Sequence, residues 1–248
     1  MPSDKHASQT PVHAGERWFT EPTTAYWQDL LPAFPSGPEG APPFRFGYPV
    51  RLPDGRALVL PIRELPEAEG AVASLIINQA SFEVVRALAG FMTDAAHNLR
   101  AEVVIGLPTL GMALAPLVAE ALGHRRYVPF GYSRKFWYDE ALSEPVSSIT
   151  SPGGGKRIYL DPNQIDLLRG RRIVVVDDAV STGRTIAATA RLLRRLSLDL
   201  VGIVVAMKQS ERWRASLSEV SPELPDLVKG VFGCPRFQKV DRGWSPAE

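Results

Sequence analysis

Cysteine is nearly absent from this sequence: Cys234 is the only one among 248 residues. A single thiol excludes an internal disulfide framework and a Cys-rich zinc site. The four histidines include no pair at metal-ligand spacing. The polar opening MPSDKHASQT lacks the apolar stretch of a secretory signal, and no run approaches the ~18 to 20 apolar residues that span a bilayer. We therefore expect a cytoplasmic protein that does not enter a membrane.

An excess of charge of either sign is also absent. The chain has 28 basic and 27 acidic side chains, a net charge of +1. This balance argues against an extended surface for nucleic acid or for a membrane. It does not exclude a small ligand with several phosphates, because backbone N–H groups and a few cations can bind one. An apolar fraction of 45% is typical of a folded domain.

Proline is abundant but unevenly distributed, since 12 of the 22 prolines lie at or before Pro66. Such density breaks helices and limits strands. We interpret residues 1–66 as a proline-rich N-terminal arm with short strands. Within it, residues 49–62 are typical of a hairpin that turns at Asp54 and Gly55. Residues 67–248 then form the main domain, with a C-terminal extension.

From about residue 72, apolar strands alternate with amphipathic helices. Ser81 is suited to cap a helix in which Phe82, Val85, Leu88, Ala89, Met92 and Ala96 lie on one face. Continuously apolar strands are expected at residues 102–107, 126–130, 172–176, 200–207 and 226–232. Strands of this kind between helices indicate a parallel sheet that is covered on both faces. The predicted fold class is α/β, with a doubly wound parallel sheet.

The segment VVVDDAVSTGRT, residues 174–185, contains the clearest chemistry. An apolar strand ends in two acids, and a small hydroxyl and glycine loop then opens a helix. The loop offers backbone N–H groups and the positive end of a helix, which suit a phosphate. We expect a phosphate to bind there, with Gly183 allowing close approach, and its contacts would be Ser181, Thr182, Gly183, Arg184 and Thr185. Carboxylates beside it suit the hydroxyls of an attached sugar, which assigns that role to Asp177 and Asp178.

Three other interpretations of this region are weaker. The two acids could simply end a capped strand. A receiver domain also begins with a strand and two acids, but only 70 residues follow Asp178 here. A P-loop is suggested by residues 153–156, but the first glycine spacing is missing and Arg157 stands where Ser or Thr is required.

The same segment resembles the phosphoribosyl diphosphate (PRPP) signature of type I phosphoribosyltransferases, apart from Ala179, where a larger aliphatic residue is usual. The resemblance covers roughly residues 45–235 and implies that family's fold. It is closest to bacterial adenine- and xanthine-type purine enzymes. Residues 105–112 resemble the family's pyrophosphate loop, which implies that pyrophosphate binds to Leu107, Pro108, Thr109, Leu110 and Gly111. In the family this loop often holds a non-proline cis peptide, here expected near residues 108–110.

Residues 131–155 have no clear period and resemble the flexible loop with which the family covers its substrate. The resemblance places two cations, Arg134 and Lys135, on the leaving pyrophosphate. A surface insertion without function is the alternative for this segment. The neighbouring Trp137 and Tyr138 have no counterpart in the family's motif.

The resemblance implies transfer of phosphoribose from PRPP to a nitrogen of a purine or purine-like base, with pyrophosphate released. Mg²⁺ would bridge substrate oxygens, with Asp177 and Asp178 as possible ligands. No side chain is evident as general base. A homodimer and a hood over the substrate, built partly from residues 1–66, are expected from the family. Base-binding candidates are Ile77, Asn78 and Lys208, and stacking candidates are Arg45, Phe46, Tyr48, Trp213 and residues 232–237.

Two other functions stay open from the sequence. A non-catalytic PRPP-sensing regulator would keep the same fold and signature. Such regulators normally carry an attached DNA-binding domain, and residues 1–66 are too rich in proline for a winged helix. The other alternative keeps the chemistry but takes orotate or another base as acceptor.

Overall fold

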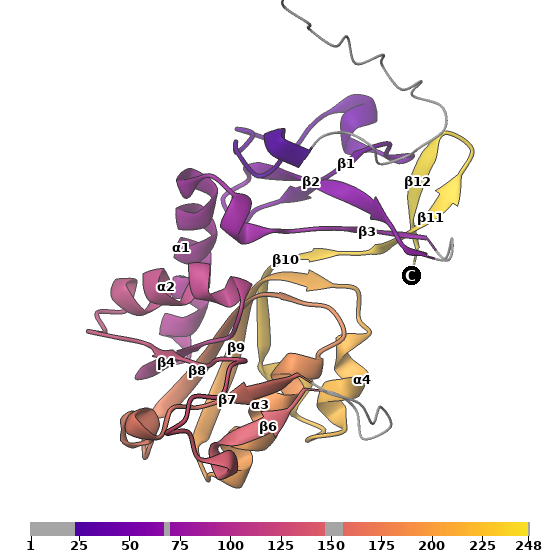
Figure 1. Ribbon diagram of the computed structural model, residues 1–248. Coiled ribbons are helices and arrows are strands. Elements are labelled where there is room, and N and C mark those ends of the chain that lie inside the picture. Colours follow the sequence, from indigo (N-terminus) through magenta and orange to yellow (C-terminus); the bar gives the residue numbers. More distant parts are fainter. Residues whose placement is uncertain (1–22, 67–69, 147–155, 248) are drawn as a thin grey trace, which may run out of the picture.

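A five-stranded parallel sheet forms the centre of the computed structural model, which describes residues 23–66, 70–146 and 156–247 (Figure 1). The strand order is β10-β9-β8-β4-β5. This is the arrangement of doubly wound sheets of the flavodoxin type. The strands are β4 (Val103–Gly106), β5 (Val128–Pro129), β8 (Arg172–Val180), β9 (Asp199–Gln209) and β10 (Val228–Cys234).

Helices cover both faces of this sheet, as the sequence predicted (Figure 1). Alternate residues of β8 point to opposite faces: Val174 belongs to the core under the first helix pair and Val175 to the core under the second. This division follows from the period of two along a strand. The first pair is α1 (Phe82–Asn98) and α2 (Ala115–Ala121), and the second is α3 (Arg184–Arg195) and α4 (Trp213–Ser218).

A second, antiparallel sheet lies against the carboxyl edge of the first. Its order is β1-β2-β3-β11-β12, so it combines both ends of the described chain. Gln209, at the end of β9, donates its side-chain amide to the Ala73 carbonyl oxygen at 2.7 Å and links the two sheets. The strands are β1 (Gly47–Arg51), β2 (Ala57–Glu64), β3 (Ala71–Ala73), β11 (Arg236–Val240) and β12 (Gly243–Ala247).

The two ends of the chain meet in an aromatic cluster. The ring of Phe237 in β11 packs edge-on against Tyr48 and Phe44, with centroid distances of 5.0 and 6.3 Å. Phe44 also exchanges backbone hydrogen bonds with Trp244. These residues belong to the same hydrophobic core as α1 and α2. The second sheet therefore contains strands from both sides of residue 66. β1 and β2 precede this residue, whereas β3, β11 and β12 follow it.

Several local expectations are confirmed and some are corrected. The hairpin turns with Gly55 at φ 89°, and the Ser81 hydroxyl caps α1 by accepting from the Val84 N–H. Phe82, expected on the buried face of α1, is 79% exposed because it occupies the first helical position, before the apolar stripe reaches the sheet. Of the N-terminal arm, residues 1–22 lie outside the described residues.

Residues 131–146 have more structure than their sequence indicated. A short 3₁₀ helix, Glu140–Leu142, leads into β6 (Ser143–Pro145), which pairs antiparallel with β7 (Arg157–Tyr159). The rest of the predicted loop, residues 147–155, lies outside the described residues. Among the helices that the structure describes, none is long and apolar enough to cross a membrane.

Phe237→Ala tests whether the C-terminal hairpin is part of the core. Removing this buried ring should lower the free energy of unfolding by about 3–5 kcal/mol, because it leaves a cavity between β1 and β11. Phe136→Ala is the control: Phe136 is 96% exposed, and its loss should change stability by less than about 0.5 kcal/mol. Urea denaturation measures both, and equal effects of the two changes would contradict the packing described.

Candidate active site

The site lies where the strand order of the parallel main sheet reverses, between β4 and β8. β4 and β8 are neighbours, with Gly106 opposite Val176, and the Leu107 N–H donates to the Val176 carbonyl oxygen at 2.9 Å. After β4 the chain crosses to α2 on one face, and after β8 it crosses to α3 on the other. The two loops therefore diverge and leave a crevice at the carboxyl edge, the usual ligand site of such sheets.

The loop after β4 holds the segment predicted to bind pyrophosphate. Its Pro108–Thr109 peptide bond is cis, within the expected range. The 3₁₀ helix Leu110–Ala113 follows and leads into α2. A Cβ built on Gly111 would stand 2.9 Å from the Cα and from Oδ1 of Asp177. Glycine is therefore required at 111 because the two strand-end loops touch there, a long-range reason that the sequence does not reveal.

The two acids form a tightly coupled pair at the end of β8. Asp177 is 8% exposed, and its carboxylate accepts hydrogen bonds from the Gly111 N–H and, at 3.0 Å, from the Asp178 N–H. Burial, followed by the negative charge of Asp178, raises the pKa of Asp177 well above 3.8. Burial raises the pKa of Asp178 as well. A buried and a partly buried acid whose pKa values are raised, side by side in a crevice, are suited to hold a cation or sugar hydroxyls.

The predicted phosphate loop lines a cavity of about 170 Å³ at the start of α3. Ser181, Thr182 and Arg184 are exposed there, and the first-turn N–H groups of the 12-residue helix have no acceptor within the helix. Together with the helix dipole they suit a phosphate. The residues that line the cavity are Asp177 and Ala179 through Ile186.

Gly183 is needed for a different reason from the one expected. Its φ of 76° is in the left-handed region, and its open side faces α4 rather than the cavity. A Cβ there would stand 2.8 Å from the Trp213 carbonyl oxygen and 2.7 Å from the Leu217 side chain. Glycine at 183 therefore lets α4 pack against the start of α3.

The candidates for base binding fall into two groups. Asn78 is exposed on the 3₁₀ helix Ile77–Gln79, which lies beside the pyrophosphate loop, whereas the Ile77 side chain is fully buried. Arg45 is exposed, with its guanidinium over the ring of half-buried Phe46. The aromatic candidates Trp213, Phe232 and Phe237 are buried in the cores, and Tyr48 packs in the aromatic cluster, so their rings are engaged by the protein itself.

Lys208 lies next to the phosphate loop, because it pairs with Val180 across β8 and β9. Its aliphatic stem runs over Gly230, whose missing Cβ leaves the space. Within the described residues its ammonium has no hydrogen-bond or ion-pair partner. Lys208 is one of the residues around a cavity of about 360 Å³ between the main sheet and the C-terminal hairpin, which is lined by Lys208, Ser210, Glu211, Gly233, Cys234, Pro235, Arg236 and Ala247.

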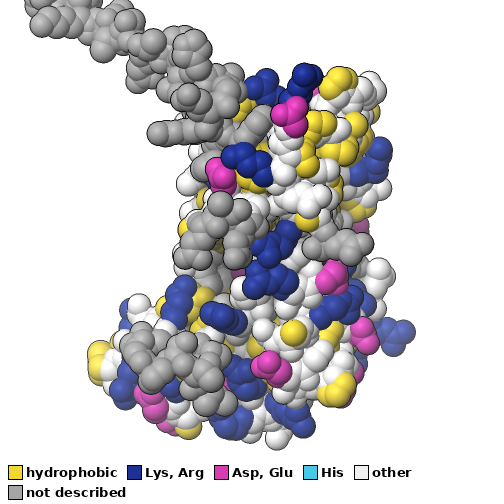
Figure 2. Space-filling view, turned by 90° about the vertical axis from the view of Figure 1, so that its right-hand side faces the viewer, with side chains coloured by type: hydrophobic (Ala, Val, Ile, Leu, Met, Phe, Trp, Pro, Cys, Tyr) yellow, Lys and Arg dark blue, Asp and Glu magenta, His cyan; other side chains and the backbone are white. Residues whose placement is uncertain are grey.

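Figure 2 shows the side of the molecule that lies to the right in Figure 1. Lys and Arg side chains are visible there at mid-height, between the part that holds the second sheet and the part that holds α3 and α4. Acidic side chains lie among them, as expected for a nearly neutral chain. The view fits local cationic sites rather than a continuous basic surface.

The segment after β5 places Arg134 and Lys135 on the surface. Arg134 Nη1 lies 3.5 Å from Glu140 Oε2, and Lys135 is exposed. The neighbouring aromatic residues have a packing role: the Trp137 indole donates to Asp161 Oδ2 at 3.3 Å, and the Tyr138 ring packs against Tyr159. Across the residues that the structure describes, no group of three His, Cys, Asp or Glu could hold a metal by itself.

Taken together, the paired acids, the loop at the start of α3 and the facing strand-end loop define an α/β protein with a crevice at its switch point that is suited to a phosphorylated ligand. The family model of the phosphoribosyl transferase domain matches residues 72–234, more than half of the chain. The chain therefore belongs to the phosphoribosyltransferase family.

Curated relatives carry several different substrate names. The chain is 34% identical to the adenine phosphoribosyltransferase of Mycobacterium avium over 116 residues, 46% of this chain and 60% of that protein. It is 26% identical to the hypoxanthine/guanine phosphoribosyltransferase of Methanobacterium lacus, over 53% of this chain and 65% of the relative. An orotate phosphoribosyltransferase of Chromohalobacter salexigens is 29% identical over 71% of each chain. The matches to the first two span less than two thirds of those relatives.

Solved structures support the fold. The adenine phosphoribosyltransferase of Thermoanaerobacter pseudethanolicus aligns with a TM-score of 0.54 at 18% identity, over 69% of this chain and 95% of that one. The enzyme of Giardia lamblia, solved with 9-deazaadenine, aligns with a TM-score of 0.53 at 16% identity, over 69% and 93%. At these identities the likeness establishes the type I phosphoribosyltransferase fold.

Asp177→Asn tests the electrostatic state of the acid pair. The folded-state pKa values lie above the unfolded value of 3.8, so the native protein binds more protons than the unfolded chain. Stability is therefore lost as pH rises from about 4 through the raised pKa values. The amide removes one charge and can donate to Asp178. Its melting temperature should exceed that of the wild type at pH 8, by about 2–4 °C for each kcal/mol relieved.

This gain should shrink as the pH approaches 4, where the wild-type pair is protonated. Thermal scans without phosphate or divalent ions measure both proteins across this range. A gain that does not depend on pH would contradict the assignment.

Proposed function

We propose that this protein is an Mg²⁺-dependent phosphoribosyltransferase that transfers the 5-phosphoribosyl group of PRPP to a nitrogen of a purine or purine-like base. The observation that carries the proposal is the convergence of three features at one switch point: a phosphate loop, the acid pair of buried Asp177 and partly buried Asp178, and a facing strand-end loop. The names of the curated relatives support this chemistry. A homodimer and a cytoplasmic location stay predictions of the family resemblance.

Each feature is assigned one part of PRPP. Residues 181–185 bind the 5-phosphate through backbone N–H groups and hydroxyls. Asp177 and Asp178 accept hydrogen bonds from the ribose hydroxyls. Residues 107–111, which contact Asp177 through Gly111, bind the pyrophosphate group. The distance between the parts of the site that bind the ribose and the pyrophosphate is then set by the pairing of β4 with β8, in which Gly106 lies opposite Val176.

Mg²⁺ fits the acid pair. It is bound by oxygen ligands, usually one or two carboxylates together with substrate phosphates. Among the described residues neither Asp177 nor Asp178 forms an ion pair, and burial raises the pKa of both. When bound, Mg²⁺ would neutralise charge on the pyrophosphate, with Asp177 and Asp178 as its protein ligands.

The reaction is a displacement at the ribose C1 carbon. The C1–O bond breaks with its electron pair leaving on pyrophosphate, and a base nitrogen supplies the pair for the new C1–N bond. The proton that this nitrogen loses passes to solvent. The chain stabilises the positive charge on the sugar with the Asp177 and Asp178 carboxylates, and the growing negative charge on pyrophosphate with Arg134 and Lys135.

Lys208 favours a base with a carbonyl group. An ammonium donates hydrogen bonds and accepts none, so it matches a carbonyl oxygen and not an exocyclic amine. Lys208 pairs with Val180 at the start of the phosphate loop, lines the cavity beside the C-terminal hairpin, and has no ion-pair partner among the described residues. Asn78, exposed on the opposite side of the crevice, is the second polar candidate for the base, whereas Ile77 would support it from within the core.

Pyrophosphate release tests the proposed reaction. The full chain is incubated with PRPP, Mg²⁺ and, in turn, adenine, hypoxanthine, guanine, xanthine and orotate. We expect release with at least one purine, and a loss of at least about a hundredfold in Asp178→Asn, whose acid lies at the ribose. Tight PRPP binding without turnover on any base would instead favour a PRPP-sensing regulator.

Lys208→Gln tests the carbonyl preference. Loss of a charged donor should raise KM for an oxo-base about 10–100-fold and leave KM for PRPP nearly unchanged. Lys229→Gln is the matched control, because Lys229 is exposed on the adjacent strand and donates only to the Asp226 carbonyl oxygen among the contacts described. An unchanged KM for every accepted base would remove Lys208 from the base site.

A further inference from the structure

Glu144 is a nearly buried carboxylate that joins the β6–β7 ribbon to α3. Its side chain is 12% exposed. The Arg191 Nε donates to Glu144 Oε1 at 3.0 Å, and Arg195 pairs with Oε2. The two arginines are four residues apart and lie on one face of α3. A carboxylate this far from water is tolerated because both oxygens are engaged by cations.

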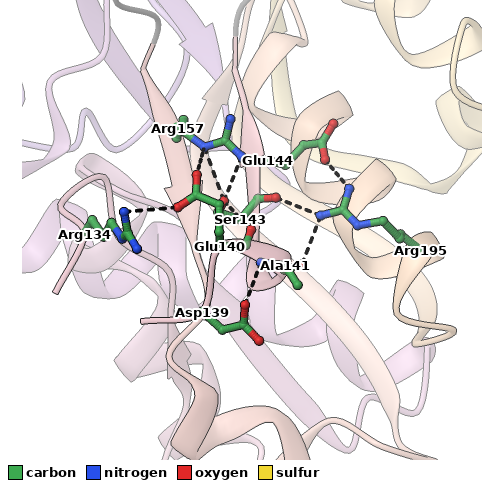
Figure 3. A network of polar contacts seen from close by, with 8 residues as sticks. All are labelled: Arg134, Asp139, Glu140, Ala141, Ser143, Glu144, Arg157 and Arg195. Atoms are coloured by element: carbon green, nitrogen blue, oxygen red, sulfur yellow. Dashed lines mark hydrogen bonds and ion pairs between the residues drawn. The ribbon is translucent and has the colours of Figure 1, made fainter. Parts of the chain in front are cut away.

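The same cluster continues toward Arg134 (Figure 3). Arg195 also donates to the carbonyl oxygens of Ala141 and Ser143, at 3.2 and 2.7 Å. The Ser143 hydroxyl accepts from Arg157 Nη2 at 2.8 Å. The network is completed by Glu140, which lies 3.4 Å from Arg157 Nε and 3.5 Å from Arg134 Nη1.

These contacts connect two parts of the site that are far apart in the sequence. α3 begins at the phosphate loop, and Glu144 holds its second half. The ribbon and the short 3₁₀ helix before it hold Arg134 through Glu140. Glu144 therefore links the helix that begins at the phosphate loop to the segment that holds Arg134.

We propose that Glu144 is a positioning residue, which sets the two cations of residues 134–135 at the correct distance from the phosphate loop. The inference rests on the proposed function, since it concerns the pyrophosphate half of the PRPP site. Glu144 itself lies on the helix side of the ribbon and touches α3, so it acts through the segment that it holds. The affinity for pyrophosphate depends on the exact position of the cations that contact it. Loss of the Glu144 contacts with Arg191 and Arg195 should therefore weaken pyrophosphate binding selectively.

Glu144→Gln keeps the shape of the side chain and removes its charge. Calorimetric titration of the full chain, with Mg²⁺ present, uses inorganic pyrophosphate as one probe and ribose 5-phosphate as the other. We expect the Kd for pyrophosphate to rise about tenfold, because the cations are misplaced. The Kd for ribose 5-phosphate should stay within about twofold, because the phosphate loop is built by β8 and the first turn of α3.

Glu102→Gln is the matched control. Glu102 pairs with Arg171 and accepts from the Arg172 N–H at the start of β8, the opposite edge of the main sheet from the site. It should leave both Kd values unchanged. Arg195→Lys keeps the charge beside Glu144 but cannot reproduce the fork of contacts, so it should raise the pyrophosphate Kd by about threefold even if Glu144→Gln fails to fold.

Equal losses for both probes, or no loss for either, in a folded Glu144→Gln would overturn the positioning role. So would an unchanged pyrophosphate Kd in Arg195→Lys when Glu144→Gln does not fold. If the wild type binds neither probe, the proposed function itself fails. If the wild type binds both and the variants match it, only the inference about Glu144 fails.

Discussion

The contact between Gly111 and Asp177 is the constraint on which the site depends. It joins the ends of β4 and β8 at the one place where neighbouring strands send their chains to opposite faces of the sheet. The absence of a side chain at 111 lets its N–H reach the Asp177 carboxylate and places the strand-end loop beside the acid pair. Phosphate loop, acids and pyrophosphate loop thus acquire a common geometry from the backbone of two strands, before any flexible side chain is considered.

Electrostatics explains how a nearly neutral chain can suit a polyanionic substrate. The net charge of +1 counts side chains only, whereas the phosphate loop supplies partial positive charge from backbone N–H groups and the α3 dipole. Beside it lie buried Asp177 and partly buried Asp178, whose raised pKa values reflect an energetic cost of ionising them in the free protein. A bound cation or sugar hydroxyls would offset that cost. The acid pair thus lowers the stability of the free protein, and ligand binding would restore it. This arrangement fits an enzyme that binds a metal together with its sugar phosphate.

The outer parts of the molecule are held by contacts between distant segments. The C-terminal hairpin completes the sheet that β1 begins, and the Phe237 ring closes its core. The same hairpin forms one wall of the cavity that Lys208 also lines. On the other side, Glu144 ties the β6–β7 ribbon to α3. The C-terminal hairpin and the β6–β7 ribbon thus both pack on elements of the main sheet or its helices. Neither is continuous in sequence with β8.

Local patterns in the sequence were sufficient for the strands of the parallel sheet, its helices and the loop between β8 and α3, because each depends on residues close together along the chain. The cis peptide between Pro108 and Thr109 was expected from the family resemblance rather than from a local pattern. The hairpin at Asp54 and Gly55 belongs to the same group. Only the tertiary structure decided that β11 and β12 join β3, that Trp213 packs against Gly183, and that Phe82 is exposed. It also decided the partners of Glu144 and Gly111. Apart from the exposure of Phe82, these outcomes depend on contacts between residues 30 to 166 positions apart in the sequence. Local spacing of residue types does not specify which distant segment will pack on a given side chain.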